Sequence, residues 1–460
     1  MSTARWSLDA AFDKPGLERP FDLELQRCAG RIGMSDWSSK NPYMAELTEN
    51  YCLTTEYSNK ETRHFSVALG DSDLDYKAGD ALAIIPHNPP ELVADLLALL
   101  GFSGEETVET HLGEQEVGHA LLHTYEIHRL NKKFIKGLEP KFDSSARPVE
   151  VRLVGRSRAE VSSGEATQQW HWSGEDEDFP ADFHPVGSAL DPSYTLWSSL
   201  VEDDEAMENY IWSRDYIDLL GDFPHLLFTP LEFVSGLDRL KPRLYSIASS
   251  PDAHPGVVEL TVAIVRYEYH GRPRGGLCTV YLADHTELNT PDIPVFMSRT
   301  RSFVLPEDGD VDIIMVGPGT GIAPFRAYLE QREIDGAKGH NWLFFGDRTE
   351  KGEFLYREQL QHWLKTGHLT QLDLAWSREP DKPKVYVQHL MQKHAAEIWV
   401  WIENGAYFYV CGDKNYMAKD VHQTLIDIVE EHGEMSADDA KQFVEVGMMK
   451  EEKRYLRDVY

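Results

Sequence analysis

The sequence predicts a chain of two parts, an α+β part built on an antiparallel β-barrel and an α/β part built on a parallel sheet. Short apolar strands separated by turns between Lys241 and Leu282 predict the barrel. After Phe303, strands alternate with helices, which is typical of a parallel sheet. A glycine-rich turn joins the first of those strands to its helix. The expected boundaries are an N-terminal extension at 1–44, a barrel part at 45–300 with a helical connecting insertion at about 90–240, and a parallel-sheet part at 301–460.

The composition indicates a globular protein with sizeable cores and a strongly acidic surface. The 460 residues are 42% hydrophobic and 27% charged, a balance that allows more than one core. The formal net charge of -32 argues against nucleic-acid binding, because such a surface repels a polyanion. No apolar run has the length of a membrane span, and no early segment has the pattern of a secretory signal. We therefore expect a cytoplasmic protein with no membrane association.

The four cysteines are too far apart in the sequence to suggest a shared site. They are Cys28, Cys52, Cys278 and Cys411, and no two of them form a C-x-x-C pair. Their spacing therefore predicts neither a disulfide framework nor a structural zinc site, and no metal is expected. Any cysteine that matters for function is expected to act alone.

The first elements of the barrel part are marked by turn residues. Val67–Leu82 carries strand-like apolar residues, and Gly79 with Asp80 predicts a turn before the apolar run Ala81–Ile85. A pair of prolines then opens an amphipathic helix, Glu91–Leu100, and the glycine after it is expected to end that helix.

The second half of the barrel part has the same pattern of strands and turns. Strands are expected within Arg243–Ser249, Val257–Tyr267 and Gly275–Tyr281. Between the two halves, from about Lys141 to Met207, the sequence shows little periodicity and carries acidic runs. We interpret those runs, Gly174–Phe179 and Glu202–Glu205, as solvated loop in an insertion at about 138–207.

The glycine-rich turn is the strongest chemical signal in the parallel-sheet part. A buried strand beginning near Val311 leads into Gly317, Gly319 and Gly321, and Pro324 suits the first turn of the following helix. Glycines let the backbone approach a pyrophosphate closely, and the helix N-terminus offers free N–H groups and a positive dipole. The turn therefore predicts a dinucleotide site, with a plain tight turn as the alternative.

The choice between NAD and NADP depends on groups that can recognise a 2′-phosphate. Ser377 and Arg378 are followed by Lys384 and Tyr386, which brings two cations and two hydroxyls to one stretch of sequence. Such groups favour a phosphate over a ribose hydroxyl, and hence NADP over NAD. Scattered surface cations are the alternative interpretation.

Six motifs in the same order give the chain a resemblance to a known family. They are Arg243–Ser246, Gly276–Thr279, Gly317–Phe325, Lys384–Gln388, Tyr409–Asp413 and the Arg-Asp-Val-Tyr ending. With them, roughly from Glu46 to Tyr460, the chain resembles the FAD and NADPH module of the diflavin reductases, which include cytochrome P450 reductase and the flavoprotein subunit of NADPH-sulfite reductase. Asn341–Gly346 and Leu374–Arg378 are similar to the sulfite reductase branch. The resemblance implies a ferredoxin-NADP reductase-like fold, with an FAD-binding barrel and a Rossmann-like NADP-binding domain.

The resemblance also implies how the barrel holds FAD. Arg243 would bind the pyrophosphate as a charged fork, Tyr245 would stack on the isoalloxazine, and Ser246 would hydrogen-bond near its N5 atom. Tyr245 is also open to interpretation as a core residue. The full set of implied FAD contacts is Arg243, Leu244, Tyr245, Ser246, Thr261, Val262, Ala263, Tyr267, Gly276, Leu277, Cys278, Thr279 and Tyr460.

The same resemblance implies the NADPH contacts and the residues around the reacting rings. The implied NADPH contacts are Gly317, Gly319, Thr320, Ser377, Arg378, Lys384, Val385, Tyr386, Val387, Gln388 and Asp420. For hydride transfer from nicotinamide to flavin, Ser246, Cys411 and Asp458 would surround the reacting atoms, and the carboxylate would stabilise the cationic ring that forms. Cys411 is equally open to a packing role. Tyr460 would cover the flavin face as a lid that nicotinamide displaces.

The expected path of the electrons ends outside this chain. Residues 1–42 leave no room for the flavodoxin-like domain that precedes this module in familiar reductases, so no FMN is expected here. Electrons would pass from NADPH through FAD to a separate acceptor, which would be a sulfite reductase haemoprotein, a flavodoxin or a ferredoxin. Our interpretation is the reductase component of an assimilatory sulfite reductase. The alternatives are a general NADPH-flavodoxin or ferredoxin reductase and, more remotely, a protein that binds FAD without catalysis.

Overall fold

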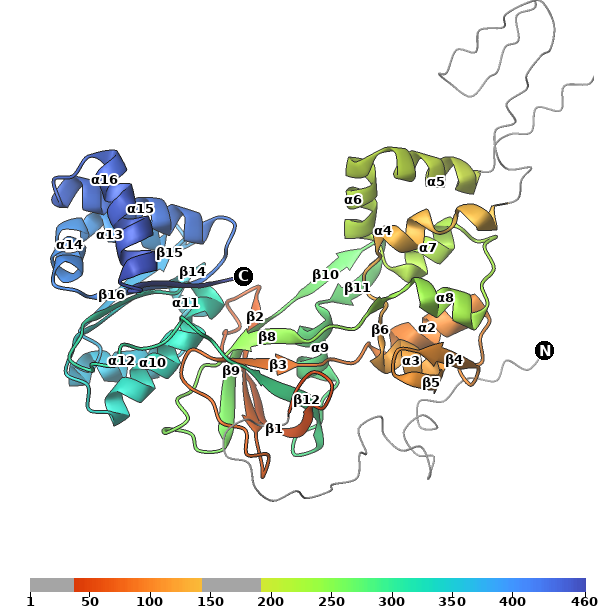
Figure 1. The fold of residues 1–460 in the computed structure, drawn as a ribbon, viewed down its shortest axis with the longest axis horizontal. Coiled ribbons are helices and arrows are strands. Elements are labelled where there is room, and N and C mark those ends of the chain that lie inside the picture. Colours follow the sequence, from red (N-terminus) through yellow and green to blue (C-terminus); the bar gives the residue numbers. More distant parts are fainter. Residues whose placement is uncertain (1–36, 143–191) are drawn as a thin grey trace, which may run out of the picture. The chain divides into compact units, whose positions relative to one another are not determined.

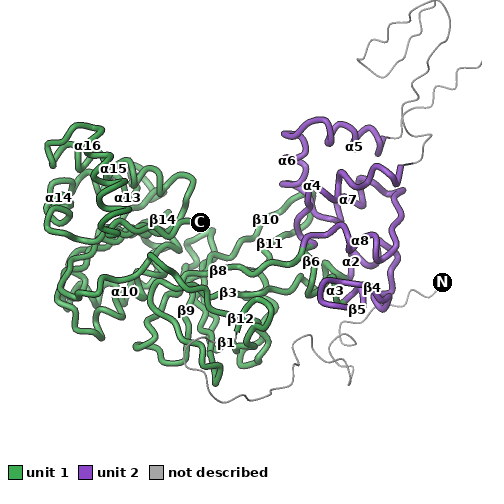
Figure 2. Tube along the Cα trace, in the orientation of Figure 1, with its two compact units in different colours: residues 1–93, 119–126, 239–460 green, residues 94–118, 127–238 purple. Residues whose placement is uncertain are grey.

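The computed structural model describes residues 37–142 and 192–460. The chain divides into two compact units, which Figure 2 shows in separate colours. Unit 1 contains the residues up to Val93, His119–Glu126 and Arg239–Tyr460, and unit 2 contains Ala94–Gly118 and Ile127–Asp238. The antiparallel and the parallel sheets therefore both belong to unit 1.

Unit 1 contains a six-stranded antiparallel sheet that wraps into a barrel (Figure 1). Its strands are β1 (Tyr43–Cys52), β2 (Glu61–Ala68), β3 (Ala81–Ile84), β8 (Arg243–Ser246), β9 (Val257–Ile264) and β12 (Pro291–Ser298). They are ordered β8-β3-β12-β1-β2-β9. Directly after β8, Ile247 forms a bridge with Leu260 of β9, and the Ala248 N–H donates to the Glu259 carbonyl at 2.7 Å. These contacts join the two ends of the sheet.

The segment after β9 differs from the strand expected there. The chain leaves the barrel at Val265 and forms a hairpin of β10 (Arg266–Tyr269) and β11 (Arg272–Gly275). His270 and Gly271 at its tip have φ angles of 51° and 67°, as a two-residue type I′ turn requires.

The expected strand at Gly275–Tyr281 is wrong, because α9 (Leu277–Asp284) occupies most of this segment. Leu277, Cys278, Tyr281 and Leu282 are buried on one helical face, and the last three of them belong to the barrel core. A short apolar run suits a buried strand and a buried helix equally well, so its pattern could not decide between them.

The second half of unit 1 contains a five-stranded parallel sheet, as the alternating pattern predicts. Its strands are β13 (Ile313–Val316), β14 (Asn341–Asp347), β15 (Gln371–Trp376), β16 (Tyr407–Gly412) and β17 (Tyr455–Val459). The order β15-β14-β13-β16-β17 places the strand that leads into the glycine turn at the centre. Its carboxyl end therefore has strand ends on both sides of it.

Helices cover both faces of the parallel sheet (Figure 1). They are α10 (Ala323–Ile334), α11 (Glu350–Glu353), α12 (Arg357–Thr366), α13 (Val387–Lys393), α14 (Ala395–Glu403), α15 (Met417–His432) and α16 (Ala437–Gln442), with a π-helical segment at Phe443–Glu451. Ile314 and Phe408 belong to the core that includes α13, α14 and α15, whereas Ile313 and Tyr409 belong to the core that includes α10 and α12. This alternation shows that the central strands β13 and β16 are buried on both faces.

The described part of unit 2 is mainly helical and includes most of the described connecting insertion. Its elements are β4 (Thr107–Thr110), β5 (Gly113–Glu116), α4 (Lys132–Lys136), α5 (Pro192–Glu202), α6 (Asp204–Ser213), α7 (Tyr216–Asp222) and α8 (Pro230–Gly236), with a short turn of 3-10 helix at Glu139–Lys141. Four elements lie where the chain passes between the units: α2 (Pro90–Leu100), α3 (Val117–His123), β6 (Tyr125–Glu126) and β7 (Asp238–Arg239). None of the described helices has the length and apolarity needed to cross a membrane.

The structure corrects the interpretation of one acidic run in the insertion. Glu202–Glu205, expected as solvated loop, is the junction between α5 and α6. The Asp203 carboxylate accepts hydrogen bonds from the N–H groups of Glu205 and Ala206 at 2.9 and 3.1 Å, so it caps α6. The other acidic run, Gly174–Phe179, lies outside the described residues.

Candidate active site

The glycine turn follows β13 and precedes α10. Its three glycines differ in what a side chain at each position would meet. A Cβ on Gly317 would lie 2.5 Å from the Gly321 carbonyl oxygen and from the Phe325 ring, and one on Gly321 would lie 2.2 Å from the Cys411 carbonyl oxygen. Packing within the turn therefore requires both residues to be glycine. Gly319 has a φ of 59°, and the nearest atom to its added Cβ would be an Asp347 carboxylate oxygen at 3.7 Å. It is the glycine that faces open space.

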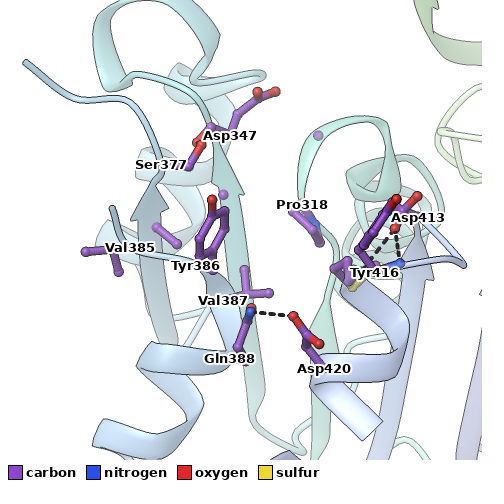
Figure 3. Close-up of a pocket in the computed structure, with 14 residues that line it drawn as sticks. Pro318, Asp347, Ser377, Val385, Tyr386, Val387, Gln388, Asp413, Tyr416 and Asp420 are labelled. Carbon is purple, nitrogen blue, oxygen red and sulfur yellow. Dashed lines mark hydrogen bonds between the residues drawn. The ribbon is translucent and has the colours of Figure 1, made fainter. Parts of the chain in front are cut away.

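That open space is a cavity of about 550 Å³ at the carboxyl edge of the parallel sheet (Figure 3). Half of its lining consists of residues that the sequence predicts as NADPH contacts: Gly319, Ser377, Val385, Tyr386, Val387, Gln388 and Asp420. The other half, which sequence reasoning missed, is Pro318, Gly346, Asp347, Ala375, Asp413, Tyr416 and Met417. The order of strands places these segments together, because β14, β13 and β16 are neighbours in the sheet. Proximity to a predicted strand end was the signal available for the missed residues.

Acidic side chains are prominent in this cavity. Asp413 accepts hydrogen bonds from the N–H groups of Tyr416 and Met417, at 2.6 and 3.0 Å, and so caps the start of α15. Asp420 accepts a 3.0 Å hydrogen bond from the Gln388 amide, which Figure 3 shows across the cavity. Asp347 is nearly buried and forms an ion pair with Lys60, whose Nζ lies 2.6 and 2.7 Å from the two carboxylate oxygens.

The predicted phosphate-binding cations lie at the edge of the cavity region and not in its lining. Arg378 follows β15, and its N–H donates to the Arg348 carbonyl at 2.7 Å, so two arginines follow adjacent strand ends. Arg378 and Lys384 are exposed, and within residues 37–142 and 192–460 neither side chain has an ion-pair partner. Both cations are thus available to an anionic ligand. Arg348 was missed by sequence reasoning, although its position directly after β14 resembles that of Arg378.

A second cluster joins the barrel to the parallel sheet. The Ser246 hydroxyl at the end of β8 donates a 2.6 Å hydrogen bond to the Asp458 carboxylate in β17. The Cys411 thiol in β16 lies 3.8 Å from the same carboxylate oxygen, because Cys411 and Asp458 are paired in the sheet. Burial, and secondarily the Asp458 charge, raise the pKa of Cys411 well above its usual value, so the thiol stays protonated. The three residues expected around the reacting atoms therefore lie together.

The C-terminal tyrosine is fixed beside the glycine turn while its ring stays exposed. The Tyr460 hydroxyl forms a 2.8 Å hydrogen bond with Thr320, and the Tyr460 N–H donates to the Gly412 carbonyl at 3.2 Å. The Lys414 N–H in turn donates to the Tyr460 carbonyl at 3.1 Å. The residue nevertheless remains 61% exposed. A large aromatic ring that is held in place without being covered suits contact with a flat ligand.

The β8 residues expected to hold FAD lie side by side at one edge of the barrel. Arg243 is half-buried, and its guanidinium donates to the Lys241 carbonyl at 2.7 Å and to Glu126 at 3.3 Å. Leu244 is 60% exposed, whereas Tyr245 packs partly buried against the barrel core. Burial raises the pKa of the Tyr245 phenol well above its usual value. Tyr245 is thus compatible with both the core role and the flavin contact, since one part of its side chain packs in the core and another part remains accessible.

The β9 residues are less accessible than the expected FAD contacts would suggest. Val262 is buried in the barrel core, and the Thr261 hydroxyl forms a 2.6 Å hydrogen bond with the Tyr356 hydroxyl. Ala263 is partly exposed, and Tyr267 on the adjoining hairpin is 44% exposed. The side chains that remain open to a ligand here are therefore Ala263 and Tyr267.

The start of α9 has the features of an anion site. Gly276 precedes the helix, and no side chain caps the helix N-terminus. The Thr279 hydroxyl donates to the Gly276 carbonyl at 3.0 Å and accepts from the Val265 N–H at 3.2 Å, which orders the turn. Leu277 and Cys278 are buried beneath it, and burial raises the pKa of the Cys278 thiol to about 12. Uncapped N–H groups in an ordered turn fit the pyrophosphate of FAD.

A buried charged network connects α10 with the barrel. The Arg326 guanidinium in α10 donates to Glu259 and to the Ala248 carbonyl and forms a 2.8 Å ion pair with Glu330. His254 Nε2 lies 3.3 Å from Glu330. His254, Glu259 and Glu330 lie close enough to hold an ion. The Arg326 charge already compensates both glutamates, so these residues are explained as a structural network.

Comparison with known proteins identifies the class to which this fold and site belong. The model of the family described as FAD binding domain matches residues 35–135 and 198–281. The model of the family described as oxidoreductase NAD-binding domain matches residues 315–423. The chain therefore combines an FAD-binding domain with an oxidoreductase NAD-binding domain, as the resemblance of its motifs implies.

Among curated proteins, the chain is similar to sulfite reductase [NADPH] flavoprotein alpha-components. It is 38% identical to that of Bacillus subtilis (strain 168) over 433 residues, which cover 94% of this chain and 63% of the relative. It is 38% identical to one from Vibrio cholerae serotype O1 over 426 residues, covering 93% of this chain and 60% of the relative. For the protein of Zymomonas mobilis, the values are 37% over 430 residues, 93% and 62%. The chain thus spans less than two thirds of the length of these relatives.

Proposed function

We propose that the chain is an NADPH-dependent, FAD-containing electron-transfer flavoprotein that serves as the reductase component of an assimilatory sulfite reductase. The observation that carries the proposal is the convergence of Ser246 and Cys411 on the Asp458 carboxylate, where the barrel meets the parallel sheet. The relatives named as sulfite reductase flavoproteins support the choice of substrate. Electrons would leave the chain for a separate acceptor, for which the haemoprotein partner of a sulfite reductase is the first candidate.

In this proposal the barrel binds FAD. Arg243 and the uncapped start of α9 would hold its pyrophosphate, since both offer donors to an anion. Tyr245 and Tyr460 would contact the flavin ring through the accessible parts of their own rings. Bound FAD would supply the redox chemistry, by accepting a hydride from nicotinamide and releasing electrons to the acceptor.

The nucleotide would occupy the cavity at the edge of the parallel sheet. Its pyrophosphate would lie against the open side of Gly319, and its adenosine end would lie between Ser377, Tyr386 and Gln388. Arg378 and Lys384 at the cavity edge would recognise the 2′-phosphate, which favours NADPH over NADH.

The chain's own contribution to hydride transfer is to hold donors and a negative charge in fixed positions. Asp458 would stabilise positive charge that develops on the nicotinamide, because its carboxylate is held in place by Ser246 and lies beside Cys411. Cys411 would remain a neutral packing residue, in agreement with the raised pKa of its thiol. Tyr460 would exclude water from the flavin until nicotinamide displaces its ring.

The proposed domain division is an extension at 1–44, an FAD-binding part at 45–300 with a connecting insertion at about 90–240, and an NADP-binding part at 301–460. The described residues of 94–118 and 127–238 form a compact unit that is mainly helical, which supports treating the insertion as a separate body. We also propose that the protein works in the cytoplasm.

Reconstitution with FAD followed by rapid mixing with NADPH tests the proposal. Bleaching of the flavin absorbance is expected, together with sulfite-dependent NADPH consumption once a sulfite reductase haemoprotein is added. Bleaching without sulfite turnover, combined with reduction of flavodoxin or ferredoxin, would instead establish a general reductase. A bound flavin that NADPH leaves oxidised would refute both enzymes and leave the non-catalytic FAD-binding protein.

A further inference from the structure

A lysine from the barrel supplies the charge partner of an aspartate in the nucleotide cavity. Lys60 lies in the loop between β1 and β2, whereas Asp347 ends β14, and their side chains form a two-pronged contact of 2.6 and 2.7 Å. The contact joins residues 287 positions apart in the sequence. Asp347 is only 5% exposed at its side chain, so its charge is poorly screened by water.

The loop that carries Lys60 is itself fixed against the parallel-sheet part. The Thr55 N–H donates to the Gly352 carbonyl at 3.0 Å, and the Ser58 hydroxyl donates to Glu353 at 2.5 Å. Because these bonds anchor the loop on α11, Lys60 is held in position and is more than a mobile surface cation.

The charge of the cavity explains why this lysine matters. Among the described residues, its lining contains three aspartates, namely Asp347, Asp413 and Asp420, and neither lysine nor arginine. Asp413 and Asp420 accept hydrogen bonds from neutral donors, and among the described residues no lysine or arginine forms an ion pair with either of them. A dinucleotide brings further negative charge, which such a lining repels. Within residues 37–142 and 192–460, Asp347 alone of these three aspartates forms an ion pair with a cation, which is Lys60.

We infer that Lys60 is a positioning and affinity residue of the nucleotide site, which neutralises Asp347 so that the pyrophosphate of the dinucleotide can bind beside it. The inference rests on the proposed function, since it assumes that the cavity binds a nicotinamide dinucleotide. The Asp347 carboxylate would be the nearest group to a Cβ on Gly319, so it borders the glycine turn where the pyrophosphate is expected. The effect should therefore be common to NADP⁺ and NAD⁺.

Calorimetric titration of the FAD-loaded full chain with NADP⁺ and with NAD⁺ tests the inference. Lys60→Met leaves Asp347 uncompensated and should weaken both nucleotides by about tenfold, with the preference between them unchanged. Combining Lys60→Met with Asp347→Asn removes the repelling charge as well and should restore binding to within about threefold of the parent protein. Lys60→Arg should bind like the parent. The matched control is Lys351→Met, which removes a cation that stacks on Tyr57 of the same loop and leaves Asp347 paired.

Each remaining outcome has a definite meaning. Unchanged affinity in the Lys60→Met protein would overturn the inference, and so would a double variant that binds as weakly as the single one, because Lys60 would then act on the nucleotide directly or only on folding. Weakening of NADP⁺ alone would overturn the placement beside the pyrophosphate. Thermal unfolding without nucleotide separates loss of fold from loss of affinity. A parent protein that binds neither nucleotide would contradict the proposed function itself.

Discussion

The Ser246 hydroxyl donates a 2.6 Å hydrogen bond to the Asp458 carboxylate, although 212 positions separate the two residues. The bond connects the last residue of β8 in the barrel with β17 in the parallel sheet. It fixes the orientation of a carboxylate that also faces the Cys411 thiol. A carboxylate held in this way needs little reorganisation when positive charge develops beside it.

Asp458→Asn should slow flavin reduction by NADPH while FAD remains bound. The amide keeps the shape of the side chain but loses the negative charge, and loss of one such group typically costs on the order of 10²-fold in rate. Rapid-mixing measurements of flavin bleaching check the rate, and the absorbance of the purified protein checks FAD content. Asp438→Asn, an exposed aspartate in α16, is the control. Normal reduction kinetics in the Asp458 variant would remove this residue from the mechanism.

Removal of Tyr460 should raise the use of NADH relative to NADPH. The ring is held by Thr320 but exposed, so its removal should open the flavin face at a small loss of about 0.5–1.5 kcal/mol of aromatic contact. Steady-state kcat/KM values for the two nucleotides measure the change. Tyr460→Phe, which keeps the ring and loses only the hydroxyl bond, should retain the original preference. If the truncated protein keeps that preference too, the residue is an ordinary chain end.

Arg378→Ala should weaken NADPH far more than NADH. Arg378 is exposed and unpaired among the described residues, so a 2′-phosphate would gain a charge-assisted hydrogen bond worth about 1.5–3 kcal/mol. Loss of that energy corresponds to a fall of about 10- to 100-fold in the affinity for NADP⁺. Calorimetric titration with both nucleotides measures the two affinities. Lys382→Ala removes a nearby exposed cation from the same loop and serves as the control. Equal weakening of both nucleotides would contradict the assignment.

The pH dependence of stability should reveal the His254–Glu330 pair. The hydrogen bond to Glu330 raises the pKa of His254 above its usual 6.5. Burial raises the pKa of Glu330, but the His254 hydrogen bond and the Arg326 charge outweigh burial and hold it below its usual 4.5. A raised histidine pKa stabilises the fold below pH 6.5 and loses this effect as pH rises through the folded value. A lowered glutamate pKa stabilises it above pH 4.5 and loses this effect as pH falls.

The pair should therefore contribute fully between about pH 4.5 and 6.5. Denaturant unfolding of His254→Gln and the parent protein should differ most in that window and least near pH 9. Because the imidazole is partly exposed, the difference should be less than about 1 kcal/mol. His362→Gln, at an exposed site, should show no such window. A difference that grows towards alkaline pH would have the wrong sign for this pair.

Sequence patterns predicted most of the architecture because strands, tight turns and alternating α/β segments are local. The strand, glycine turn and helix around Gly319 are present as expected, and so is the helix that ends before Gly101. Short segments were less predictable. Gly275–Tyr281 is mostly helical because its apolar residues pack on the barrel, and Glu202–Glu205 is a helix junction because Asp203 caps α6. For Gly275–Tyr281 the deciding contact lies outside the residues that carry the pattern, whereas for Glu202–Glu205 it is a hydrogen bond from the acidic run to the first turn of α6.

The site was predictable in its composition and less so in its electrostatics. Ser377, Tyr386 and Gln388 line the cavity together, as their motifs suggest. Arg378 and Lys384 lie outside the lining, and the cation that faces the cavity's Asp347 comes from the barrel. A motif gives the order of residues along one segment, but it contains no information on a side chain that reaches in from another.

The sequence by itself determined the two-part fold and the glycine turn. Hydrogen-bonding and hydrophobic periodicity within single segments are sufficient to encode these features. Only the tertiary structure decided that Ser246 would hold Asp458 and that Lys60 would neutralise Asp347. Both contacts join the barrel to the parallel sheet, and their partners are brought together by the packing of whole elements, which no local pattern specifies.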